Sequence, residues 1–154
     1  MRWEEVAPVA PGRGEALVRQ SAVGLNFIDI YERTALYGGQ LPTGLGREAA
    51  GVVEAVGSGV RDIKAGDRVA YASPAPGAYA DERVMPAASL VPVPEGVSDR
   101  LAAAALLKGM TAQVLLRRTY KVRKGTVVVV HAAAGGVGSI LVQWALHLGA
   151  HVIA

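Results

Sequence analysis

The glycines at 135, 136 and 138 are the first residues of chemical interest in the sequence. Backbone that lacks a Cβ turns sharply and lets an anion approach the N–H groups at the start of a helix. The spacing Ala133-x-Gly135-x-x-Gly138 resembles the GxGxxG pattern that holds a dinucleotide pyrophosphate, with alanine in the first position and Gly136 in addition. We therefore expect a pyrophosphate to lie against Ala134, Gly135, Gly136, Val137 and Gly138. The alternative is a glycine-rich turn in an ordinary α/β protein.

The elements on either side of these glycines favour the dinucleotide interpretation. Residues 126–130 read TVVVV, an apolar run without alternation, which is typical of a strand buried on both faces of a parallel sheet. Ile140, Trp144 and Leu148 recur every four residues, as on one face of a helix, and Gly149 suits the position just past its end. Residues 150–154 begin a second strand. Strand, glycine turn, helix and strand form the opening of a dinucleotide-binding βαβ unit.

Polar residues outside the turn have two interpretations each. Asn26 directly precedes a short helical segment, 27–33, and is placed as its N-cap. Lys108 belongs to the segment KGMT and either meets an anion or is a cation at the end of a helix. Glu48 could donate a proton, although an ion pair or a loop anchor is the favoured role. The three histidines, 131, 147 and 151, are expected to be surface or core residues rather than metal ligands.

Composition narrows the class of protein. The 154 residues carry a net charge of +3, and 51% of them are hydrophobic, which indicates a globular chain. The absence of cysteine excludes disulfides and thiolate metal sites and favours the cytoplasm. The longest run free of His, Gln or charge in the apolar final stretch, 132–142, holds three glycines and is far shorter than the roughly 20 residues of a membrane span. The basic segment 117–124 is interpreted as a solvated helix end, so neither a nucleic acid nor a membrane is an expected partner.

The elements before the turn must place these residues. Short strands are predicted at 15–23, 49–56, 68–72, 78–85 and 90–94, which indicates a small β-barrel or a partly open sandwich. Two helices follow, at 99–108, with Gly109 as its stop, and at about 111–119. The predicted domains are a β domain at 1–97, a helical bridge at 98–124 and the start of a nucleotide-binding domain at 125–154. Because a doubly wound sheet needs more strands, we expect the chain to be a piece of a longer protein.

Five segments, in this order, are similar to the zeta-crystallin-like quinone oxidoreductases of the medium-chain dehydrogenase/reductase superfamily. They read GLNFIDIYERTALY, GREAAGVVEAVGSGV, IKAGDRVAY, LLKGMTA and HAAAGGVGSILVQWA. The resemblance implies a mixed α/β fold, a GroES-like β-barrel catalytic domain followed by the first βαβ of a truncated Rossmann domain. It also implies NADPH as hydride donor, NADH not being excluded, and a quinone or enone as acceptor. The members of this family are commonly homodimers.

The resemblance further implies individual roles. Asn26 and Tyr31 would contact both the cofactor and the acceptor, Tyr37 would line the acceptor pocket, and Lys108 and Thr111 would face the cofactor. Zinc-dependent relatives carry a cysteine where this chain has Asn26, and a histidine where it has Arg47. Because arginine is always charged and does not ligate metals, we predict that no zinc is bound. The alternatives are an enoyl or alkenal reductase of the same superfamily, and a non-catalytic fragment or binding module.

Overall fold

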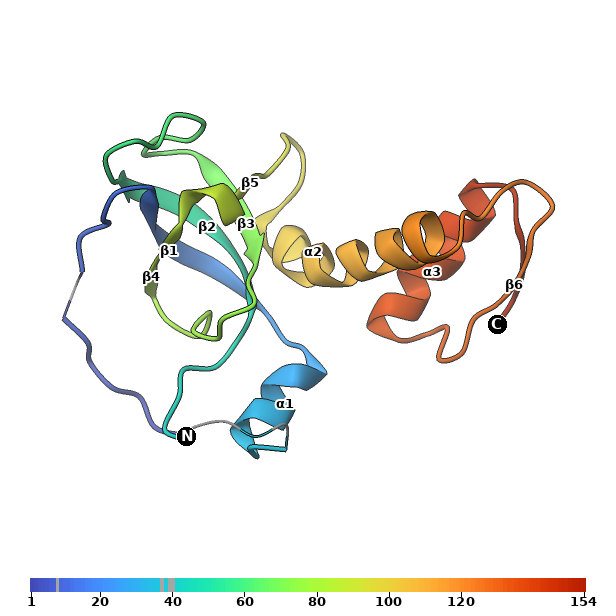
Figure 1. The fold of residues 1–154 in the computed structure, drawn as a ribbon, viewed down its shortest axis with the longest axis horizontal. Helices are drawn as coiled ribbons and strands as arrows, with labels where there is room; N and C mark the ends of the chain where they lie inside the picture. The colour runs from blue at the N-terminus through green and yellow to red at the C-terminus, as the bar shows by residue number, and fades with distance from the viewer. Residues whose placement is uncertain (8, 37, 39–40) are drawn as a thin grey trace. The chain divides into compact units, whose positions relative to one another are not determined.

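The computed structural model describes residues 1–7, 9–36, 38 and 41–154. Tyr37, one of the predicted acceptor contacts, lies outside the described residues. Contacts divide the chain into two compact units, Met1–Ala104 and Ala105–Ala154, and each is described by itself (Figure 1).

The first unit is built on one antiparallel sheet with the strand order β4-β1-β2-β3-β5. The strands are β1 (Glu15–Gly24), β2 (Glu48–Val56), β3 (Arg68–Ala72), β4 (Glu82–Pro86) and β5 (Val91–Pro92). The register between β1 and β2 shifts at Leu17/Val18 and again at Gln20/Ala22. Such irregularities bend a strand and increase its twist, which lets the sheet curve around an interior.

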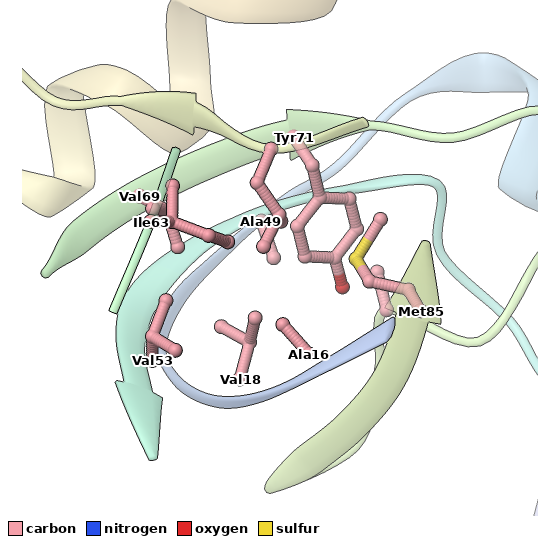
Figure 2. Close-up of a cluster of buried hydrophobic side chains, with 10 residues drawn as sticks. Ala16, Val18, Ala49, Val53, Ile63, Val69, Tyr71 and Met85 are labelled. Carbon is pink, nitrogen blue, oxygen red and sulfur yellow. The ribbon is translucent and has the colours of Figure 1, made fainter. Parts of the chain in front are cut away.

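Side chains from four of the strands and their loops fill this interior. Figure 2 shows Val18, Val53, Val69, Tyr71 and Met85 directed toward one another, all of them buried. They occupy alternate positions along their strands, so the period of two that marks a half-buried strand produces the core. Burial of each such side chain contributes about 1.5–3 kcal/mol, which stabilises the frame that carries the first group of predicted site residues.

The last two strands of this unit are shorter than predicted. β4 starts at Glu82, not at Ala78, because the bend in β1 interrupts the pairing and the Gln20 side chain instead donates to the Ala80 carbonyl at 2.6 Å. β5 holds only Val91 and Pro92, after a 3-10 turn at Ala87–Ser89. Prolines at 92 and 94 lack an N–H for the ladder.

One long helix replaces the two helices predicted after residue 98. α2 spans Asp99–Gln113 and runs on as a π-helical segment, Val114–Thr119. Gly109 was expected to end the first helix, and that prediction was wrong. Glycine inside a helix is less favourable than alanine by only about 1 kcal/mol. Burial of Ala103, Ala112 and Leu116 stabilises the continuous helix by more than this.

The second unit contains the predicted strand, turn, helix and second strand. β6 (Val127–Val129) and β7 (His151–Ile153) pair in parallel, and α3 (Gly136–His147) connects them. Leu116, Val122, Ala145 and Ala150 form the buried cluster of this unit, with Val128 and Trp144 packed against it.

The prediction that the first strand is buried on both faces was wrong for this chain. Val127 and Val129 are 64% and 61% exposed, while Val128, on the other face, packs against the cluster of the second unit. Among the described residues, the side chains of the two strands that pack against this cluster are Val128 and Val152, and neither Val127 nor Val129 belongs to it. Within the described ranges, no helix combines the length and the apolar character that a membrane span requires.

Candidate active site

A backbone hydrogen bond closes the turn before α3, and the closed turn leaves no room for a side chain at residue 138. The N–H of Gly135, the N-cap residue, donates to the Ala132 carbonyl at 2.8 Å, and Ala132 itself has a φ of 51°. A Cβ on Gly138 would lie 2.2 Å from the Ala132 oxygen. The carbonyl of Ala132 therefore occupies the space that a side chain at 138 would need, and the turn requires glycine there.

Three backbone amides remain at the start of this helix. Ser139 N–H donates to the Gly135 carbonyl at 2.8 Å, which is the first bond of the helical ladder. By helix geometry the N–H groups of Gly136, Val137 and Gly138 precede the ladder, and the hydrogen bonds among the described residues include no partner for them. Together with the positive end of the helix dipole, these amides can bind an anion. Gly135, whose N–H is already used, contributes shape and no donor.

Lys108 lies beside the same helix start, within the second unit. An ideal Cβ on Gly136 would be 2.9 Å from Lys108 Cδ and 3.0 Å from its Cε. Because α2 continues to Gln113, Lys108 is not at a helix end, so the alternative of a cation on a helix C-terminus was wrong. A cation at a helix N-terminus gains nothing from the dipole, whereas an anion bound there would be attracted by both. Thr111, one turn further along α2, donates its hydroxyl to the Leu107 carbonyl at 2.9 Å.

In the first unit, Asn26 is the N-cap residue of α1 (Phe27–Arg33), as predicted. Its side-chain Nδ2 donates to Glu48 Oε2 at 2.9 Å, and Glu48, the first residue of β2, is fully buried. The Cα of Gly24 packs on that carboxylate so closely that a Cβ would lie 2.4 Å from Oε2. Because a carboxylate only accepts hydrogen bonds, it determines which end of the Asn26 amide faces it.

Asp29 fastens the start of the same helix. Its buried carboxylate accepts from the Asn26 backbone N–H at 2.8 Å and from the Tyr79 hydroxyl at 2.9 Å. Burial and the nearby Asp29 carboxylate raise the pKa of Tyr79 to about 12. These two contacts give Asp29 a structural role at the start of α1.

Arg47 occupies the position at which zinc-dependent relatives carry a histidine. Its guanidinium forms an ion pair with Glu32 of α1, with Nε 2.7 Å from Oε1, and both side chains are largely buried. An arginine held in this way offers no lone pair to a metal. In the parts of the chain that the structure describes, no three His, Cys, Asp or Glu residues are grouped as a metal site would require.

Tyr31 lies one helical turn after Phe27 on α1, and the two rings form a tilted pair with centroids 6.3 Å apart. The site residues therefore form two groups. Asn26 and Tyr31 belong to the first unit, and Lys108, Thr111 and the glycine turn belong to the second. Sequence reasoning missed two contacts, Asn26 with Glu48 and Lys108 with Gly136, because each joins positions more than 20 residues apart with no local signal.

Comparison with known proteins supplies relatives over nearly the whole chain. A quinone oxidoreductase of Pseudomonas aeruginosa is 50% identical over 154 residues, which cover 99% of this chain and 47% of the relative. A 2-haloacrylate reductase of a Burkholderia species is 49% identical over 157 residues, covering 98% of this chain and 47% of the relative. The crystal structure of Escherichia coli quinone oxidoreductase complexed with NADPH superposes with a TM-score of 0.92 at 49% identity, covering 97% of this chain and 46% of that one.

This chain thus spans about half the length of the relatives it matches. The predicted fold, a GroES-like β domain followed by the start of a Rossmann-type parallel sheet, is confirmed, and so is the resemblance to quinone oxidoreductases. The alcohol dehydrogenase GroES-like domain family matches residues 12–95, more than half of the chain. The chain belongs to this family.

Proposed function

We propose that the native protein is an NADPH-dependent quinone oxidoreductase that transfers hydride from the nicotinamide to a quinone without a metal. The observation that carries this proposal is the helix start at Gly136–Gly138, where backbone amides and the Lys108 side chain come together. That arrangement suits a pyrophosphate or a ribose phosphate. The relative solved with NADPH has the same fold over nearly the whole of this chain, which supports NADPH as the cofactor.

The cofactor supplies the hydride. Residues 134–138 would hold its pyrophosphate, with the amides of Gly136, Val137 and Gly138 as donors. Lys108 would place a positive charge on a phosphate or a ribose oxygen. Thr111 Oγ1 donates to Leu107, so its lone pairs would accept from the carboxamide N–H₂ of the nicotinamide. The turn that presents these amides depends on glycine, because a Cβ at Gly135 or Gly138 would lie 3.0 or 2.2 Å from the Ala132 oxygen.

Asn26, Tyr31 and Tyr37 would form the acceptor side. Glu48 accepts a hydrogen bond from Asn26 Nδ2 and so orients the amide, and Asn26 would contact the carbonyl group of a quinone or an enone. With Arg47 held by Glu32, no metal would polarise that carbonyl, and catalysis would rest on placement and exclusion of water. We further propose the domain division 1–97, 98–124 and 125–154.

The test is NADPH oxidation by the native protein with a panel of benzoquinones and naphthoquinones, in the presence and absence of a metal chelator. We expect quinone-dependent oxidation that the chelator does not change. No oxidation with any quinone would refute the proposed activity, and loss of activity with the chelator would refute its metal independence.

A second candidate is reduction of an electron-poor alkene, as in an enoyl or alkenal reductase. It is favoured by the 2-haloacrylate reductase, which is nearly as similar to this chain as the quinone oxidoreductase. The same oxidation assay with 2-haloacrylates and enoyl thioesters separates the two candidates. A higher kcat/KM for an alkene than for every quinone would favour the second.

A further inference from the structure

The additional glycine of the turn, Gly136, has no role in forming the turn. Gly135 and Gly138 both approach the Ala132 carbonyl oxygen, which an ideal Cβ would meet at 3.0 Å and 2.2 Å. The backbone of Gly136 lies outside the positive-φ region, so any residue could adopt it. The three atoms nearest to a Cβ at Gly136, outside its own helix turn, would be Cδ, Cε and Cγ of Lys108, at 2.9, 3.0 and 3.6 Å.

These contacts show how the Lys108 side chain reaches the start of α3. Its methylene stem lies on the Cα of Gly136, in the space that any other residue would fill with a Cβ. Lysine stems commonly pack along apolar surface while the ammonium extends beyond it. Cδ and Cε of the stem lie 2.9 and 3.0 Å from the position of a Cβ on Gly136, the first residue of α3, so the ammonium is one bond beyond this contact.

We infer that Gly136 is a positioning residue, whose bare Cα lets the Lys108 stem cross the helix start and present its ammonium to a phosphate of the cofactor. The inference rests on the proposed function for the identity of the anion. It divides the roles among the three glycines: Gly135 and Gly138 shape the turn, and Gly136 makes space for a cation. Alanine at 136 would displace the flexible lysine and leave the fold intact.

The test is a double-mutant cycle on the native protein, read out by fluorescence titration with NADPH and by thermal unfolding. Gly136→Ala should weaken NADPH binding about tenfold, the effect of losing one charge-assisted hydrogen bond. Lys108→Ala should weaken it by a similar factor. In the Lys108→Ala background, where no stem remains to be displaced, Gly136→Ala should have no further effect. The thermal midpoint of Gly136→Ala should be no lower than that of the unsubstituted protein, because alanine has the higher helix propensity.

Gly109→Ala is the matched control, because it is the same substitution beside Lys108 and its Cβ would meet nothing within 4 Å. It should leave NADPH affinity unchanged. The inference is overturned if Gly136→Ala binds NADPH normally, if it weakens binding equally in both backgrounds, or if it lowers the thermal midpoint. The equal effect would mean that the Cβ meets the cofactor itself. Absence of NADPH binding by the unsubstituted protein would instead refute the proposed function.

Discussion

Gly138→Ala tests whether the turn before α3 has the tightness that the geometry gives it. The new Cβ would lie 2.2 Å from the Ala132 oxygen and 2.8 Å from Ala133 Cα, both of them backbone atoms. Ordinary contact begins at 3.4 Å, so the Ala132 carbonyl oxygen would have to move away by about 1.2 Å. That movement breaks the hydrogen bond from Gly135 N–H, which closes the turn.

The cost combines two terms. Crowding of this kind in a packed site costs about 1–3 kcal/mol, and loss of the turn hydrogen bond adds about 1 kcal/mol. Alanine returns up to about 1 kcal/mol through its helix propensity. We therefore expect Gly138→Ala to lower the free energy of unfolding by about 2 kcal/mol and to abolish detectable NADPH binding, because the amides lose their common orientation.

Urea unfolding monitored by circular dichroism measures the stability, and fluorescence titration measures NADPH binding. Gly109→Ala is again the control, with an expected gain of up to about 1 kcal/mol, since its Cβ meets no atom within 4 Å. A Gly138→Ala protein that is as stable as the unsubstituted protein and binds NADPH with the same affinity would refute the steric reasoning.

Three further predictions concern the first unit. Asn26→Ala leaves the buried Glu48 carboxylate without one hydrogen-bond donor, so we expect the free energy of unfolding in urea to fall by about 1–3 kcal/mol. The double variant Asn26→Ala, Glu48→Gln should recover part of this loss. A double variant that is less stable than Asn26→Ala alone would contradict the prediction. The pKa of Tyr79 is raised to about 12, so the stability that this residue contributes is complete below about pH 10 and is lost as the pH rises toward 12. Tyr79→Phe should therefore reduce the pH dependence of the free energy of unfolding between about pH 10 and 12. An unchanged pH dependence in that range would contradict the assignment. The Ser21 hydroxyl and the Arg68 guanidinium lower the pKa of Asp99, so its contribution is present above the ordinary pKa of 3.8 and is lost as the pH falls below it. Arg68 and Asp99 form an ion pair, so Asp99→Asn should destabilise the protein at neutral pH and weaken the acid dependence of its stability. Unfolding at a series of pH values measures both effects, and equal stability at neutral pH would show that this ion pair contributes nothing.

The elements with a strong local signal could be predicted from the sequence. The valine run, the glycine spacing and the four-residue recurrence from Ile140 correspond to β6, the turn and α3. The N-cap at Asn26 followed from the residue type and its position. Both depend on interactions within a few residues, which sequence patterns record.

Features that depend on tertiary packing could not be predicted. Gly109 has the local signal of a helix end, yet buried side chains on either side of it hold α2 continuous. The lone valine run gives no sign that Val127 and Val129 are exposed. The pairing of Asn26 with Glu48 and the path of Lys108 over Gly136 exist only once distant segments have packed together.

A crystal structure of the native protein grown with NADPH tests the central claim most directly. We predict that pyrophosphate oxygens lie within about 3 Å of the amide nitrogens of Gly136–Gly138, and that the Lys108 ammonium contacts a phosphate or ribose oxygen. NADPH bound with its pyrophosphate away from this helix start, or side chains filling the space in front of these amides, would contradict it.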